Sequence, residues 1–175
     1  MPVIGDSSRF AAEYERHDEP RSAWMFGRFC FWCGGQRVGD YTLVTSLRDV
    51  LFGVEGVLRY AGRRRSVRFN RVPAADLLQQ LSKGLFGEGD PSEPLGDVTE
   101  EEWARHIALP AVDVFDAWSA FVVEDSESAR LVTSHLPDGV VRELSLRPGE
   151  FDEVLLLVQA ELNELYARSE RRDPE

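Results

Sequence analysis

The hydrophobic residues of the first 60 positions change from a strand-like to a helix-like spacing. Apolar and aromatic runs bounded by turn residues predict strands over residues 10–15, 24–32 and 36–43. Gly34 and Gly35 separate the last two runs, and two consecutive residues that tolerate positive φ angles are typical of a tight turn. We therefore expect a β-hairpin here.

Helical spacing of apolar residues then predicts four helices. Ser46 and Asp49 form a variant of the capping box ahead of the first, which carries its apolar residues between positions 47 and 58. Gly53 and Gly56 each weaken this helix by about 1 kcal/mol relative to alanine, so they are expected to let another segment pack closely. The other helices are predicted to begin at Pro73, at a capping box formed by Thr99 and Glu102, and at Pro148.

The last third of the chain predicts a strand meander followed by a long amphipathic helix. Strand-like runs cover residues 118–123, 129–135 and 140–146, and short turn sequences separate them. We therefore expect one α+β domain over residues 1–170, in which helices pack on one face of an antiparallel sheet. The glycine- and proline-rich stretch 87–97 is interpreted as a mobile loop or subdomain join, and residues 171–175 as a frayed tail.

Composition supports a stable, soluble domain without a membrane segment. The chain has 175 residues, of which 43% are hydrophobic, enough for a substantial core. Its start lacks the features of a secretory signal, and no apolar run approaches the roughly 18 residues that a membrane span needs. We therefore expect a cytoplasmic protein whose cysteines are thiols.

Cys30 and Cys33 have the spacing of a thiol redox centre or of half a zinc site. They lie within a predicted strand, where successive side chains point to opposite faces, so their sulfur atoms are expected to point apart. A zinc site would need two more ligands, but there is no third cysteine and the three histidines are far apart in sequence. We interpret the pair as packing residues, with redox or metal chemistry as the alternative.

No other motif indicates catalysis or a cofactor. Gly87 and Gly89 are similar to a fragment of a nucleotide-binding loop, but no Lys-Ser or Lys-Thr follows them. Acidic residues are numerous, yet the sequence does not bring two of them into one cleft for acid–base catalysis. We therefore predict no cofactor, no metal and no enzymatic activity.

Charge is distributed unevenly along the chain. The net charge is −11, although the segment 59–72 contains six arginines and no acidic residue; the remainder carries −17. Arginines beside Phe69 could contact nucleic acid, with the ring stacking on a base, but we favour a solvated turn and strand whose arginines pair with acids. The acidic remainder would repel nucleic acid and attract basic proteins.

The acidic residues form clusters that are candidates for contact with a basic partner. Two clusters flank predicted loops or element ends, from which they could meet a partner without a change of fold. Their candidate binding residues are Asp97, Glu100, Glu101, Glu124, Asp125 and Glu127. The alternative is an ordinary solvated surface. A third cluster, at positions 150–153, is partly explained by the helix dipole, because it opens the last helix.

Several phrases of the sequence together resemble the immunity protein 42 family of bacterial polymorphic toxin systems. They are VIGDSSRFAAEYE, WMFGRFCFWCGGQRVGDY and TSLRDVL within the first 60 residues, and DVFDAW and PGEFDEVL after residue 110. The resemblance implies a small cytoplasmic protein that binds and blocks a cognate toxin domain and protects the producing cell. The acidic composition would suit capture of a basic toxin, such as a nuclease. The resemblance supplies no functional residues. An adaptor or chaperone for a secreted effector is the alternative.

Overall fold

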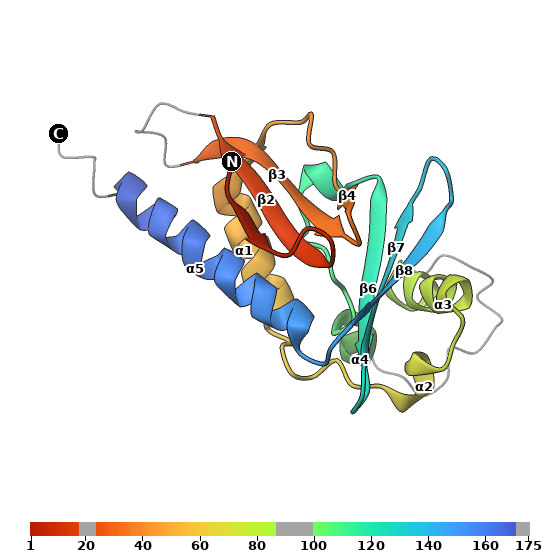
Figure 1. Cartoon of the computed structure of the whole chain (residues 1–175). Helices are drawn as coiled ribbons and strands as arrows, with labels where there is room; N and C mark the ends of the chain where they lie inside the picture. Colours follow the sequence, from red (N-terminus) through yellow and green to blue (C-terminus); the bar gives the residue numbers. More distant parts are fainter. Residues whose placement is uncertain (18–23, 87–99, 171–175) are drawn as a thin grey trace.

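The computed structural model describes residues 1–17, 24–86 and 100–170 (Figure 1). The predicted loop at 87–97, Thr99 of the predicted capping box and the predicted tail at 171–175 lie outside these residues. Within the described part of the chain, no helix combines the length and apolar character needed to cross a bilayer.

The first sheet is antiparallel and has five strands, in the order β1-β2-β3-β4, with β5 pairing with β3. Its strands are β1 (Val3–Gly5), β2 (Phe10–Arg16), β3 (Phe26–Cys33), β4 (Gln36–Val38) and β5 (Thr45–Ser46). Gly34 and Gly35 join β3 to β4 with φ angles of 60° and 80°, which confirms the predicted hairpin. The strand expected over residues 36–43 ends early because Gly39, with φ of 110°, turns the chain away.

The second sheet is the predicted meander, in the order β6-β7-β8. Its strands are β6 (Trp118–Glu124), β7 (Ala129–His135) and β8 (Val141–Leu146). The helices are α1 (Leu47–Leu58), α2 (Val67–Asn70), α3 (Ala74–Phe86), α4 (Glu100–Ala104) and α5 (Glu150–Glu170), with a 3₁₀ turn, η1, at Asp113–Phe115. The α+β class is confirmed, but the strands form two sheets where the sequence suggested one.

The main core lies between the five-stranded sheet and the helices α1 and α5, which cover the same face of that sheet (Figure 1). Strand alternation points Phe29 and Phe31 into this core, and Phe10 of β2 stacks on Phe151 of α5 with ring centroids 4.9 Å apart. One face of the second sheet closes the same core. Its other face packs against α3 and α4 in a smaller cluster that includes Leu77 and Trp103.

The side chain of Arg64 is fully buried, and its hydrogen bonds connect four segments of the chain. Its Nε donates to Asp152 Oδ1 of α5 at 2.9 Å, and its Nη2 donates to the Val57 carbonyl at 2.9 Å. Its Nη1 donates to the carbonyls of Arg105 and Ile107, at 2.5 and 3.2 Å. Every nitrogen of the guanidinium therefore has a partner, as a buried charge requires.

Candidate functional site

The acidic residues predicted to bind a partner occupy different environments. Asp97 lies outside the described residues, and Glu100 is described only as the first residue of α4. Glu101 is exposed and pairs with Arg63 at 2.7 Å. Glu127 is exposed in the turn between β6 and β7. A binding role for these residues stays a prediction.

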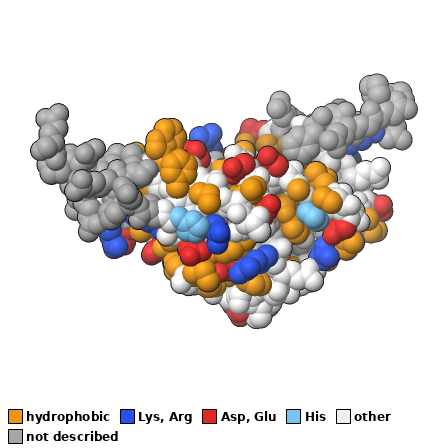
Figure 2. All heavy atoms as spheres, turned by 90° about the horizontal axis from the view of Figure 1, so that it is seen from above, with side chains coloured by type: hydrophobic (Ala, Val, Ile, Leu, Met, Phe, Trp, Pro, Cys, Tyr) orange, Lys and Arg blue, Asp and Glu red, His pale blue; other side chains and the backbone are white. Residues whose placement is uncertain are grey.

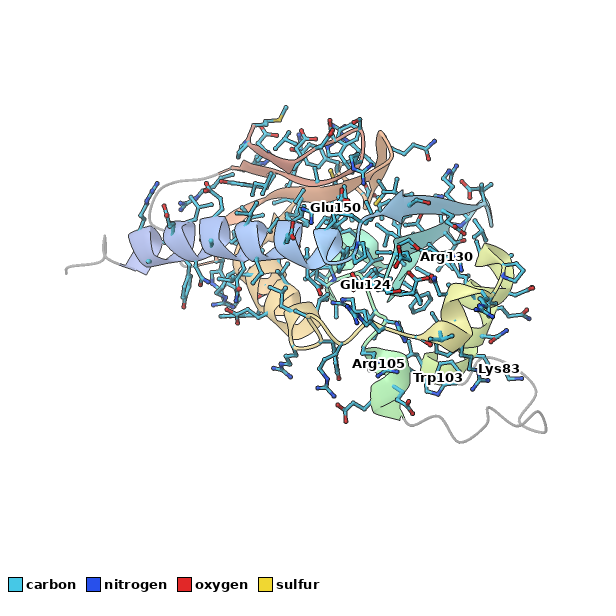
Figure 3. The ribbon with its side chains drawn as sticks, turned by 60° about the horizontal axis from the view of Figure 1, so that its bottom comes forward. Lys83, Trp103, Arg105, Glu124, Arg130 and Glu150 are labelled. Atoms are coloured by element: carbon cyan, nitrogen blue, oxygen red, sulfur yellow. The ribbon has the colours of Figure 1, made fainter. Side chains whose placement is uncertain are left out.

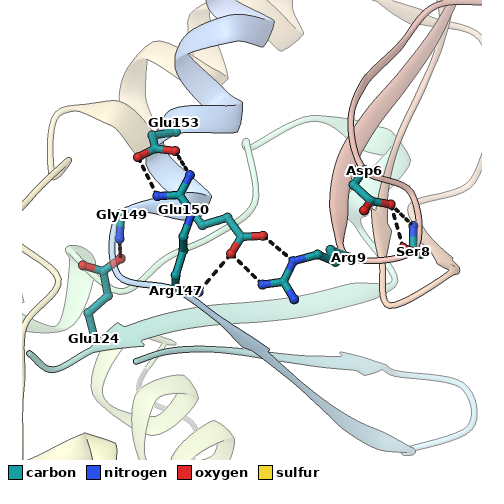
Figure 4. Close-up of polar contacts among 8 residues, drawn as sticks. All are labelled: Asp6, Ser8, Arg9, Glu124, Arg147, Gly149, Glu150 and Glu153. Atoms are coloured by element: carbon teal, nitrogen blue, oxygen red, sulfur yellow. Dashed lines mark hydrogen bonds and ion pairs between the residues drawn. The ribbon is translucent and has the colours of Figure 1, made fainter. Parts of the chain in front are cut away.

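Glu124 and Asp125 already hold the protein's own backbone. Glu124 is buried at the end of β6, where its Oε1 accepts a hydrogen bond from the Gly149 N–H at 3.0 Å (Figure 4). Asp125 accepts from the N–H groups of Glu127 and Ser128 at 2.7 and 2.8 Å, and these bonds lower the pKa of its carboxyl group. The Glu124 carboxylate thus supports the turn that leads into α5, and a binding role for Glu124 and Asp125 stays a prediction.

The third acidic cluster is a structural junction at the start of α5. Its ion pairs are Arg9–Glu150 and Arg147–Glu153, which Figure 4 shows, and Arg64–Asp152. Glu150 accepts two hydrogen bonds from Arg9, at 2.8 and 2.7 Å, and these lower the pKa of its carboxyl group. Figure 3 places Glu124 and Glu150 near this junction, away from Trp103 and Lys83 at the α3–α4 end. These acidic side chains therefore hold α5 in place.

The two cysteines are free thiols on opposite faces of β3. Cys30 is buried beneath the outer face of the sheet, and Cys33 points towards the main core. Burial raises the pKa of each thiol to about 12, so both stay protonated near neutral pH. This agrees with a packing role.

The arginine-rich segment forms a turn and the short helix α2, where the sequence suggested a turn and a strand. Phe69 is buried between Trp103 and His106, with ring centroids 5.3 Å from each, so it cannot stack on a base. Arg130 of β7 holds the end of α2 by donating to the carbonyls of Asn70 and Val72, at 2.7 and 2.9 Å. These contacts favour a structural role for the segment.

A hollowed apolar surface follows residues 107–113, the green stretch that leads from α4 to β6 in Figure 1. Three hollows, of about 370, 600 and 220 Å³, lie along this 107–113 segment, and all three are lined in part by the exposed Ala111. The largest also includes three exposed apolar side chains, Trp24, Phe26 and Val44. Exposed hydrophobic patches of this kind are typical of binding sites.

The charged residues that line these three hollows are all acidic. Asp116 lines the 370 Å³ hollow, Asp49 and Asp113 line the 600 Å³ hollow, and no charged residue lines the smallest. A neighbouring hollow, which shares Asp116, Trp118 and Ser119 with the 370 Å³ hollow, is lined by Lys83, and a further hollow is lined by Arg142. The surface beside the 107–113 segment is therefore apolar and lined by acidic residues, with Arg48 at its edge over the Trp24 ring.

A second feature lies on the outer face of the five-stranded sheet, at the opposite end of β3 from Phe26. The guanidinium of Arg37 lies 4.9 Å from the Trp32 ring centroid and 4.6 Å from that of Tyr41. The buried Glu13 accepts from Trp32 Nε1 at 2.9 Å and from Arg37 at 3.2 Å. Burial, followed by the charge of Glu13, raises the pKa of Tyr41 to about 12. Trp, Tyr and Arg are the residues enriched at binding hot spots.

Figure 2 looks down on the side that carries the five-stranded sheet in Figure 1. Hydrophobic side chains lie there among acidic and basic ones. The chain's net charge of −11 is thus not spread as a uniform acidic field on this face. Recognition at this face would depend on the local arrangement of side chains.

Sequence reasoning selected acidic residues and missed the apolar surface. Its parts come from the segments 24–26, 44–49 and 107–113, which are remote in sequence. The sequence offers little to identify this surface. Strand periodicity predicts that Trp24 and Phe26 share one face of a strand, but it does not show whether that face is exposed. Charge is visible in a sequence, whereas an exposed apolar patch requires the tertiary structure.

Comparisons with known proteins identify the class to which this α+β domain belongs. The fold is similar to that in the crystal structure of CdiI from Burkholderia dolosa, with a TM-score of 0.70 and 21% sequence identity. The match covers 91% of this chain and 99% of that one.

The profile of the Immunity protein 42 family matches residues 1–161, and the chain belongs to this family. It is therefore a toxin-neutralising immunity protein, a class that binds a cognate toxin. The family resemblance noted in the sequence is confirmed. The curated proteins include no match to this chain.

Proposed function

We propose that this protein neutralises its cognate toxin by stoichiometric binding that covers the toxin's working surface, with no chemical step of its own. The observation that carries the proposal is the family match over residues 1–161. The thiol pKa values of about 12 support it, because they leave Cys30 and Cys33 poor nucleophiles at neutral pH. An effector chaperone, the alternative function, is less well supported than immunity.

The toxin is proposed to be a basic domain, such as a nuclease, that is met in the cytoplasm. A net charge of −11 favours rapid encounter with a cationic partner. Within this proposal, exposed acids such as Glu101 and Glu127 contribute to the encounter rate. The proposal extends to Asp97 and Glu100 as predicted from the sequence.

The test is to purify the toxin domain encoded beside this reading frame and to titrate its activity with the protein. We expect a stable complex and complete loss of toxin activity. Absence of both binding and inhibition would refute the proposal for that pair. A partner that binds but has no toxic activity would favour the chaperone alternative.

A further inference from the structure

We propose that the 107–113 segment and its three hollows form the surface that holds the toxin domain. The matching toxin surface would present apolar side chains bordered by lysine or arginine. This inference rests on the immunity function proposed above and adds to it the face that binds and the chemistry it recognises.

The first argument is the apolar area that the surface leaves exposed. Trp24, Phe26 and Val44 are 49%, 45% and 49% exposed, and all three line the 600 Å³ hollow. The neighbouring Leu43 is 42% exposed. A partner that covers these large apolar side chains removes them from water, and this burial favours binding.

The second argument is charge complementarity. Asp49, Asp113 and Asp116 line the hollows. Arg48 lies beside them, 3.7 Å from the Trp24 ring centroid, and pairs with Asp49 at 3.4 Å, so the acids outnumber the bases here. Cationic side chains around an apolar contact would therefore meet opposite charges. A second copy of this chain fits less well, because a symmetric contact would bring the same three acids face to face.

The third argument is rigidity, because an ordered surface loses little entropy on binding. The Ala108 N–H donates to the Ala120 carbonyl at 3.1 Å, and Ile107 forms a bridge with Phe121. The buried Arg64 holds the Ile107 carbonyl at 3.2 Å. The 107–113 segment is therefore anchored at its start by β6 and by a buried side chain.

Its middle is anchored on α1. A Cβ atom placed on Gly53 would lie 2.7 Å from Pro110 Cβ, which shows how closely the segment approaches the helix. At its end, Asp113 Oδ1 accepts a hydrogen bond from Thr45 Oγ1 at 2.7 Å. Between these anchors, Ala111 is exposed and lines all three hollows, so it is suited to a mutational test.

The experiment places the same substitution at three exposed alanines. Ala111→Arg inserts a bulky cation among the hollows, whereas Ala75→Arg on α3 and Ala160→Arg on α5 are matched controls elsewhere on the surface. Binding of each variant to the purified neighbouring toxin domain is measured by calorimetry. We expect Ala111→Arg to weaken binding about 30-fold or more, and each control to stay within about threefold of wild type.

Two further measurements keep the test independent of any single variant. Thermal unfolding checks that each variant folds, and Phe26→Ala, which shortens an exposed side chain, replaces Ala111→Arg if that variant does not. Amide hydrogen exchange of the wild-type complex needs no variant. We expect slower exchange in residues 107–113 upon binding than in the free protein.

The outcomes separate this inference from the proposed function. If wild type binds and inhibits the toxin while Ala111→Arg, once shown to be folded, binds equally well, the surface assignment is overturned and the immunity function stands. Loss of binding only in Ala160→Arg would move the interface to α5. If wild type neither binds nor inhibits, the proposed function itself fails for that toxin. Self-association that Ala111→Arg abolishes, without effect on the toxin, would also overturn the inference.

Discussion

Individual buried charges determine how the segments of this protein are held together. Arg64 and Asp152 form an ion pair at 2.9 Å with side chains 0% and 8% exposed, whereas Arg63 and Glu101 form one at 2.7 Å with side chains 59% and 60% exposed. The two pairs have similar geometry. They differ in burial. Removing one partner would leave a charge without water in the buried pair and a hydrated charge in the exposed pair.

We expect Arg64→Met to lower the free energy of unfolding by about 3–5 kcal/mol, because it leaves the Asp152 carboxylate buried without its cation. Arg63→Met breaks an exposed pair and should cost less than about 1 kcal/mol. Urea unfolding of both variants measures the difference. Equal losses would show that Arg64 does not hold the segments as its contacts indicate.

His106 should make stability depend on pH. Burial lowers its pKa from 6.5 to about 4, and its Nδ1 contacts the Val122 carbonyl at 2.9 Å. Between pH 6.5 and pH 4, His106 binds more protons in the unfolded state than in the folded state. The contribution of neutral His106 to the free energy of unfolding is therefore complete above pH 6.5 and decreases as the pH falls towards 4. Between pH 7 and pH 5, we expect the free energy of unfolding of wild type to fall by about 2 kcal/mol more than that of His106→Gln. Urea unfolding at several pH values measures this difference. Equal pH dependence of the free energy of unfolding in the two proteins would contradict the prediction.

The sequence could not distinguish these residues from their neighbours. Arg63, Arg64 and Arg65 are consecutive, and only the tertiary structure shows that the middle one is buried. Glu124 appeared to be one acid in an acidic turn, yet it accepts from the Gly149 N–H across 25 positions of sequence. Charge patterning predicts solvation well, but burial of a charge depends on long-range partners.

At the scale of elements, the two glycines of α1 have different roles. Gly53 faces Pro110 closely, whereas a Cβ on Gly56 would meet no heavy atom within 4 Å. The expectation that both glycines permit close packing is therefore met at Gly53 and not at Gly56. Both glycines lower the helix propensity of α1, but only Gly53 allows a neighbouring segment to pack closely.

Gly56→Ala should therefore stabilise the protein by about 0.5–1 kcal/mol, because it raises helix propensity without a clash. Gly53→Ala should destabilise it by about 1–3 kcal/mol, because the new methyl group displaces the 107–113 segment. The midpoints of urea unfolding report both changes. Stabilisation by Gly53→Ala would contradict the close approach of Pro110.

Elements with strong local signals were predicted well. The capping residue Ser46 accepts from the Asp49 N–H at 3.2 Å, as the sequence indicated, and the Gly34–Gly35 hairpin and the β6–β8 meander are present. Elements that depend on partners were missed. The two-residue β5 forms because it pairs with β3, and nothing local identifies it. Division of the strands into two sheets likewise reflects packing.

At the scale of the whole molecule, the sequence indicated the protein class, whereas the binding face that we propose could be argued only from the structure. The family phrases are structural: they specify a hairpin, a helix cap and the start of α5. The proposed interface joins three remote segments, and its central residue, Ala111, carries no chemical signal.

We propose that the protein acts by occupying its toxin, with no chemical step of its own. The most direct measurement is an activity titration of a fixed amount of the purified toxin domain, read at several incubation times. Residual activity should fall linearly and reach zero at one protein per toxin, independent of time. Complete inactivation by about one hundredth of that amount, progressing with incubation, would show turnover and rule out stoichiometric inhibition.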